Sequence, residues 1–487
     1  MTEQPAPAAS GRPGRDLTSG PIMQTLLVFA LPTLASNVLQ SLNGSVNSVW
    51  VGRLIGEAAL AATANANIIM FLVFAAVFGF GMAATIKVGQ AFGAREIDAA
   101  RRTFGTAVGF CVGLAIIVAV AGWIGAPALL DILSTPGDSR GLALTYLRVI
   151  FLAMPASMLA VMLSMGLRGS GDANTPLKFM ALTVVLDVVL NPLLIRGAGP
   201  LPALGIAGSA LSTAIATYVG LIANIAFIYW RDLPLRLRGA ELGYLVPDRA
   251  ELKYILGKGL PMGAQMLIIS GAGIVMVGIV NREGLLTAAA YSATLQLWTY
   301  LQMPAMAIGA AVSAMAAQSI GAGLPERLDR ITRSGVIANV AMTGVLTAIL
   351  LIFDRAVLVL FLGPDSPAVP LARHIQFLAS WSFIPFGATI VLFGTMRAGG
   401  VVYAPLIILA IAMYPVRLGV IALAMPHIGA DAIWLSFPVG SLVTTALAYY
   451  AYRRPGWRKA GRIVGPLEAA EECQASGEAA GRMQPAL

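Results

Sequence analysis

Charged residues are scarce in this chain, and their scarcity already restricts what the protein can be. Only 11% of its 487 residues are Asp, Glu, Lys or Arg, whereas 58% are hydrophobic. Soluble domains carry about 25% charged residues. The mean hydropathy is +0.80, and apolar runs of roughly 18 residues or more, each long enough to cross a bilayer, recur through the chain. The composition therefore excludes an ordinary soluble domain and predicts an all-α polytopic membrane protein.

Cysteine and histidine are almost absent, with two of each. Cys111 lies in an apolar run and Cys473 near the end of the chain, so we expect neither a disulfide framework nor a metal site. His374 and His427 fall in predicted outer loops. No G-x-x-x-x-G-K-[ST] motif is present, so no phosphate-binding loop for ATP is visible. These absences count against an enzyme and against an ATP-driven pump.

Basic residues exceed acidic ones by nine, but their distribution does not indicate nucleic-acid binding. With both termini and alternate loops on one side of the membrane, that side holds 24 of the 32 Lys and Arg residues. The other side holds seven, and Arg417 lies within a predicted helix. Because basic loops stay on the cytoplasmic side, this pattern predicts cytoplasmic termini. The excess of Arg over Lys, 27 to 5, indicates a GC-rich bacterium, so we expect a bacterial inner membrane.

The sequence repeats itself once. QAFGA at Gln90–Ala94 matches QSIGA at Gln318–Ala322 in the second half. LRGSGDANTPL at Leu167–Leu177 matches MRAGGVVYAPL at Met396–Leu406, at nearly the same offset along the chain. We interpret this as duplication of a six-helix unit. An even number of helices gives both copies the same orientation, so the prediction is twelve transmembrane helices in two homologous lobes related as a parallel 6+6 repeat.

The repeat also divides the chain. The predicted segments are a disordered cytoplasmic N-terminus, an N-lobe of six helices, a cytoplasmic linker, a C-lobe of six helices and a disordered cytoplasmic tail, at residues 1–20, 21–231, 232–250, 251–454 and 455–487 respectively.

One apolar stretch, Leu182–Ile195, contains a lone carboxylate, Asp187, and an amide, Asn191. The two residues are four apart, so they share one face of a helix. Pro192 follows directly, which predicts a kink or an end of the helix there. An ionisable residue within a membrane span is costly and is by default a functional candidate. The alternative is a structural Asp bonded to a neighbouring helix.

Other polar residues are candidates for the same site. Asn43 and Asn47 lie four residues apart on the first predicted helix, and Thr213 lies near the start of the sixth. We expect these residues to line a site with Asp187 and Asn191 in the N-lobe. The C-lobe carries PVRLG at Pro415–Gly419 where the N-lobe carries its Asp, so Arg417 is either structural or a substrate contact.

With these residues in place, the chain resembles the multidrug and toxic compound extrusion (MATE) family, in particular its DNA-damage-inducible branch. The resemblance covers residues 22–453 and rests on six pieces: ALP in the first helix, VWVGRLIGEAALAA, GQAFGA, LRGSGDANTPL, LNPLLI and GIAGSA. It implies a twelve-helix, two-lobed exporter of organic cations and amphiphilic drugs, driven by H⁺ or Na⁺ antiport. No cofactor beyond the coupling ion is implied, and the expected partners are small molecules and the lipid bilayer, with no nucleic acid and no obligate protein partner.

The chain departs from the family pattern at three places. The family often has an Asp near the end of the first helix, where this chain has Asn47. In the fifth helix the usual order of Asn and Asp is reversed. Sodium-coupled members carry acidic residues where this chain has Ile269 and Phe386. Asp187 is the one remaining carboxylate, which supplies too few anionic ligands to coordinate a metal cation well. The sequence therefore favours H⁺ coupling through Asp187.

Four alternatives remain open. A related two-lobed fold could carry lipid-linked sugars or another endogenous metabolite, although few buried bases are available for an anionic lipid. A major facilitator transporter would have a charged signature where GQAFGA stands. A membrane enzyme would need a convergent set of catalytic residues, and none is evident. A channel would not need a duplicated unit.

Overall fold

The computed structural model describes residues 16–132, 137–197 and 202–454. Within these ranges the chain is helical, without strands, and twelve helices are long and apolar enough to cross a membrane. The predicted all-α fold with twelve membrane spans is therefore confirmed. The first six spans are α1 (Ile22–Leu54), α2 (Glu57–Gly93), α3 (Ile97–Ile132), α4 (Gly137–Gly169), α5 (Asn174–Arg196) and α6 (Ile206–Trp230).

The second half is assembled from more pieces, because two of its spans are interrupted. A 3₁₀ turn and a π-helical turn divide the spans at Ala368–Ala398 and Tyr403–Ile428. The elements are η1 (Gly239–Leu245), α7 (Arg249–Arg282), α8 (Leu285–Gly321), α9 (Pro325–Ile352), α10 (Asp354–Leu362), α11 (Ala368–Ala379), η2 (Ser380–Ser382), α12 (Phe383–Ala398), α13 (Tyr403–Ile411), η3 (Ala412–Val416), α14 (Arg417–Ile428) and α15 (Asp431–Arg453).

The duplication is visible in the helix boundaries. α2 and α8 both have 37 residues, and each ends within its copy of the Gln-x-x-Gly-Ala motif. α4 ends at Gly169 and α12 at Ala398, while α5 begins at Asn174 and α13 at Tyr403. Both pairs keep the offset that separates Leu167 from Met396 in the repeated motif. The repeated sequence therefore corresponds to a repeated order of helices.

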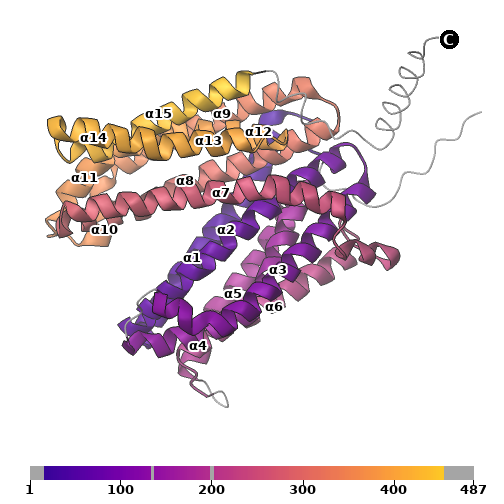
Figure 1. Ribbon diagram of the computed structural model, residues 1–487, viewed down its shortest axis with the longest axis horizontal. Helices are drawn as coiled ribbons and strands as arrows, with labels where there is room; N and C mark the ends of the chain where they lie inside the picture. The colour runs from indigo at the N-terminus through magenta and orange to yellow at the C-terminus, as the bar shows by residue number, and fades with distance from the viewer. Residues whose placement is uncertain (1–15, 133–136, 198–201, 455–487) are drawn as a thin grey trace, which may run out of the picture.

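The two halves meet at one end of the molecule and diverge toward the other (Figure 1). α2 packs against α7 and α8, and α1 packs against α8, so the contact between halves is built mainly from the first two helices of each. The described chain begins and ends at the joined end, which we call the terminal end.

Reciprocal hydrogen bonds close the terminal end. Gln90 Nε2 on α2 donates to the Ala398 carbonyl at 2.7 Å, and Gln318 Nε2 on α8 donates to the Gly169 carbonyl at 3.1 Å. Both glutamines are buried, each 3% exposed. Lys87 adds an ion pair from α2 to Glu251 on α7 at 2.8 Å. The duplicated motif thus forms a nearly symmetric seal between the halves.

Residues 16–20 differ from the prediction of a disordered N-terminus. Leu17 is fully buried and its backbone N–H donates to Gln318 Oε1 at 3.1 Å. Arg327 donates to the carbonyls of Ser19 and Gly20, both at 3.1 Å. A short segment with one apolar side chain is therefore docked on the terminal end. The rest of the predicted N-terminal segment and the whole predicted tail lie outside the described residues.

Both histidines lie in helices, so their predicted placement in loops is wrong. His374 is on α11 and His427 is in the last turn of α14. His374 Nε2 lies 2.8 Å from Asp431 Oδ1 at the start of α15. The helices here extend beyond the apolar runs from which the loops were predicted.

Candidate functional site

Asp187 is placed by α5 in the interior of the first half. α5 continues through Pro192 to Arg196, so the proline does not end the helix. α5 packs against α1 and α6, and the face that carries Asp187 and Asn191 lies toward both. Asp187 is 2% exposed and Asn191 is 1% exposed. A carboxylate this deeply buried needs partners for its oxygens.

Three side chains donate hydrogen bonds to the Asp187 carboxylate. Asn43 Nδ2 on α1 donates to Oδ2 at 3.0 Å. Ser212 Oγ on α6 donates to Oδ1 at 2.6 Å and also lies 3.0 Å from the Asp187 carbonyl. Thr213 Oγ1 lies 3.2 Å from both carboxylate oxygens. Within the described ranges no Lys, Arg or His pairs with Asp187.

A second layer of polar side chains adjoins the first. Asn47 Oδ1 accepts from Asn191 Nδ2 at 2.6 Å and from Ser209 Oγ at 2.8 Å. Asn191 Oδ1 is buried without a hydrogen-bond partner. Tyr146 on α4 is 4% exposed and lies beside Asn47. The site therefore contains an unpaired acceptor one helical turn from the carboxylate.

This arrangement suits a group that changes its charge. Neutral donors offset part of the cost of burying an ionised carboxylate. Hydroxyl groups both donate and accept, so Ser212 and Thr213 can also accept a hydrogen bond from Asp187 in its protonated form. The same few side chains can thus accommodate Asp187 with or without a proton.

The structure brings all five predicted site residues into one connected cluster. Asn43, Asn47, Asp187, Asn191 and Thr213 are joined through the bonds above, although their role in transport stays a prediction. Sequence reasoning missed Ser209, Ser212 and Tyr146. Ser209 lies one turn before Thr213 on α6, so its spacing was an available signal. Ser212 gave none, since a serine in a helix often bonds only its own backbone.

Ile269 and Phe386, where the family resemblance led us to look for the acidic residues of a sodium site, are apolar. Ile269 is 40% exposed on α7, and Phe386 makes an edge-to-face contact with Phe383, with ring centroids 6.1 Å apart. No group of three or more His, Cys, Asp or Glu side chains suited to a metal ion occurs in the part of the chain that the structure describes.

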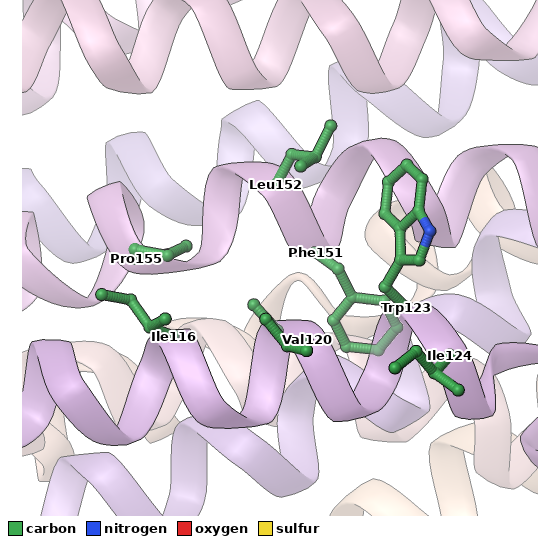
Figure 2. Close-up of a pocket in the computed structure, with 8 residues that line it drawn as sticks. Ile116, Val120, Trp123, Ile124, Phe151, Leu152 and Pro155 are labelled. Atoms are coloured by element: carbon green, nitrogen blue, oxygen red, sulfur yellow. The ribbon is translucent and has the colours of Figure 1, made fainter.

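A separate apolar groove lies between α3 and α4 and is unsuited to ion binding (Figure 2). Its volume is about 380 Å³. Ile124 and Leu152, two of its lining residues, are 73% and 60% exposed. Side chains this exposed and this apolar suit contact with lipid tails rather than with an ion, so the polar cluster around Asp187 remains the candidate site. The groove is lined by Ile116, Ala119, Val120, Trp123, Ile124, Phe151, Leu152 and Pro155.

Comparisons with known proteins agree with this geometry. The family model described as MatE matches residues 32–193 and 261–423. The probable multidrug resistance protein YoeA of Bacillus subtilis is 32% identical over 441 residues, covering 90% of this chain and 95% of that protein. The FAD transporter of Shewanella oneidensis is 23% identical, covering 90% and 96%.

The fold is shared with solved transporters. A MOP superfamily transporter from Pyrococcus furiosus superposes with a TM-score of 0.83 at 19% identity, covering 91% of this chain and 98% of that one. Family model, relatives and fold describe a multi-pass membrane transporter of the multidrug efflux type rather than an enzyme. The chain therefore belongs to the MatE, or multidrug and toxic compound extrusion, family.

Proposed function

We propose that the protein is an antiporter that exports organic cations and amphiphilic compounds in exchange for protons, with Asp187 as the proton carrier. The cargo and the proton compete for the N-lobe site in this scheme. Cargo binding displaces the proton, and reprotonation from the opposite side releases the cargo. The two lobes rock around the site between these steps.

One observation carries the proposal: Asp187 is buried among neutral donors with no cationic partner in the described residues. The alternative from the sequence is a structural Asp bonded to a neighbouring helix. The hydrogen-bond partners of such an Asp would suit only one of its protonation states. Here two of its three partners are hydroxyl groups, which serve either state. A carboxylate without a fixed counter-charge is also free to take a cationic cargo as its partner.

Protons fit this site better than Na⁺. Sodium would have to be held by one carboxylate together with the oxygens of Asn47, Asn191 and nearby hydroxyls. Asn47 Oδ1 is already occupied by two donors, so the unpaired Asn191 Oδ1 is the one amide oxygen of this pair left for the ion. A proton needs only Asp187 and one acceptor, so the chain's single buried acid in this site is sufficient.

We further propose that the terminal end faces the cytoplasm of a bacterial inner membrane. The excess of Lys and Arg on that side supports this orientation. Because the halves are joined at this end, the described conformation would be closed to the cytoplasm. Alternating access then requires the contacts of Gln90 and Gln318 to break in each cycle.

A second candidate cargo is an endogenous metabolite or a lipid-linked compound carried by the same fold. The similarity to the FAD transporter of Shewanella oneidensis favours a metabolite. The two cargo classes are distinguished by which compound drives proton exchange.

The test is ethidium efflux from vesicles containing wild type or Asp187→Asn, under an imposed pH gradient or an imposed Na⁺ gradient. The proposal predicts efflux driven by the pH gradient and lost in the variant. Asp172→Asn is the matched control, because this partly exposed carboxylate lies outside the cluster and bonds backbone N–H groups at the start of α5. Efflux driven by Na⁺ alone would overturn proton coupling. If folded wild-type protein moves no ethidium under either gradient, the metabolite or lipid-linked cargo takes precedence.

A further inference from the structure

The second half buries a cation where the first half buries its carboxylate. Arg417 opens α14 and is 8% exposed. Its Nε atom is buried without a hydrogen-bond partner. Among the described residues no Asp or Glu forms an ion pair with it. A buried charge without a partner is costly, so this side chain needs either a function or a counter-ion.

The position of Arg417 follows from the repeat. α5 begins at Asn174 and α13 begins at Tyr403, 229 residues later. The same offset of 229 residues relates Asp187 to Val416. The π-helical turn at Ala412–Val416 adds one residue to the second copy, because π-helical bonds span five residues instead of four. Arg417 therefore takes the place of Asp187 in the fold, with the opposite charge.

The surroundings of Arg417 are mainly aromatic, with the Tyr291 hydroxyl as a polar neighbour. Its guanidinium carbon lies 4.4 Å from the centre of the Phe437 ring on α15. Phe437 in turn contacts Trp298 and Tyr291 on α8, with ring centroids 5.1 Å and 6.4 Å apart. Aromatic faces attract a guanidinium, but they offer no hydrogen-bond acceptor in the plane of its N–H groups.

A glycine and a second unpaired donor lie near the same aromatic cluster. Gly440 presents no side chain to the guanidinium, and a Cβ there would lie 3.7 Å from Arg417 Nε. Gln376 Nε2 is also buried without a partner, while Gln376 Oε1 accepts from Trp298 Nε1 at 3.1 Å. Two unpaired donors thus adjoin one aromatic cluster.

The geometry points to Arg417 as the binding site for the acidic group of an aromatic organic anion or zwitterion. The guanidinium pairs with a carboxylate, sulfonate or phosphate through its planar N–H fork. The aromatic part of the ligand would pack beside Phe437, the least buried of these rings at 9% exposed. The role of this site in export rests on the proposed transport function, whereas binding itself is measurable without transport.

The test is calorimetric titration of purified full-length protein with naphthalene-2-sulfonate. We expect saturable binding by wild type and at least a tenfold higher Kd for Arg417→Gln, since a hydrogen bond to a charged group contributes that much. Arg417→Lys keeps the charge but loses the fork, so an intermediate Kd is expected. Arg282→Gln removes an exposed charge at the end of α7 and should leave the Kd unchanged.

Gly440→Val keeps the arginine and fills the space beside it, so it decides the matter if Arg417→Gln does not fold. It should also raise the Kd at least tenfold. Absence of saturable binding to wild type overturns the proposal. So does an unchanged Kd in Arg417→Gln or, if that variant does not fold, in Gly440→Val. An equal loss in Arg282→Gln would attribute binding to general surface charge and overturn it as well. Failure of the proposed antiport is distinguishable, because it abolishes gradient-driven ethidium efflux while sulfonate binding persists.

Discussion

The seal at the terminal end depends on two glycines that leave room for backbone contact. A Cβ added at Gly93 on α2 would overlap the carbonyl oxygen of Gln318 on α8. A Cβ at Gly321 on α8 would overlap the carbonyl oxygen of Gln90 on α2. In each case the obstacle is backbone, which cannot rotate away. Gly93→Ala and Gly321→Ala should therefore force the two halves apart at this end.

The size of the effect follows from two losses. Inserting a methyl group into a packed contact costs about 1–3 kcal/mol. Separation also weakens the Gln90–Ala398 and Gln318–Gly169 hydrogen bonds; losing about half of each, at about 1 kcal/mol per bond, adds about 1 kcal/mol. Each variant should thus destabilise the closed terminal end by roughly 2–4 kcal/mol. Since about 1.4 kcal/mol is a factor of ten, the equilibrium shifts about 30-fold to 1,000-fold toward the open terminal end.

Distance measurements between spin labels report this equilibrium. Labels are attached at Glu96→Cys and Glu326→Cys, in a background with Cys111→Ala and Cys473→Ser. Both label positions are exposed, and they follow α2 and α8 respectively. The distance distribution of wild type should be dominated by one short component. In Gly93→Ala or Gly321→Ala a longer component should dominate.

Gly113→Ala is the matched control, because nothing lies within 4 Å of a Cβ there. It should leave the distances unchanged and stabilise α3 slightly, since alanine favours a helix over glycine by roughly 0.5–1 kcal/mol. If Gly93→Ala and Gly321→Ala give the same distances as Gly113→Ala, the helix ends do not form the seal and the reasoning is wrong.

Three further predictions concern the N-lobe site and the tail. Ser212→Ala removes a hydrogen-bond donor to the Asp187 carboxylate and should slow pH-driven ethidium efflux at least about tenfold. Ser48→Ala, on the exposed side of α1, is the control and should not slow efflux. Equal efflux rates in the two variants would show that Ser212 is not part of the site. Asn47→Asp keeps the oxygen that accepts from Asn191 and Ser209 and adds a second carboxylate to the site. The variant should therefore fold, and its efflux should become dependent on Na⁺. A drop in melting temperature of more than a few degrees without Na⁺ dependence would mean that Asn47 has only a packing role. Deleting residues 456–487 should leave efflux unchanged, and loss of efflux from folded protein would contradict the prediction that the tail is dispensable.

The polar cluster was largely predictable from sequence. In apolar helices the few polar side chains stand out, and residues four apart share a face. Asp187 with Asn191, and Asn43 with Asn47, could therefore be assigned to a common site without any structure. What the spacing could not give was the partner of each oxygen, because this depends on how α1, α5 and α6 pack.

Other features depend on interactions that spacing does not encode. The π-helical turn before Arg417 shifts the helical register by one residue. Pro415 alone does not predict a π-helical turn. Leu17 is buried because the two halves meet beneath it, which no local pattern indicates. The glycines of the duplicated motif were visible as a repeat, but their close approach to a facing backbone was not.

The central claim is that a proton on Asp187 is exchanged for cargo. It is tested most directly by adding ethidium to purified protein in weakly buffered detergent solution and measuring released protons with a pH-sensitive dye. The account predicts close to one proton per bound ethidium for wild type and none for Asp187→Asn, with Asp172→Asn behaving as wild type. Proton release that persists unchanged in Asp187→Asn would contradict it.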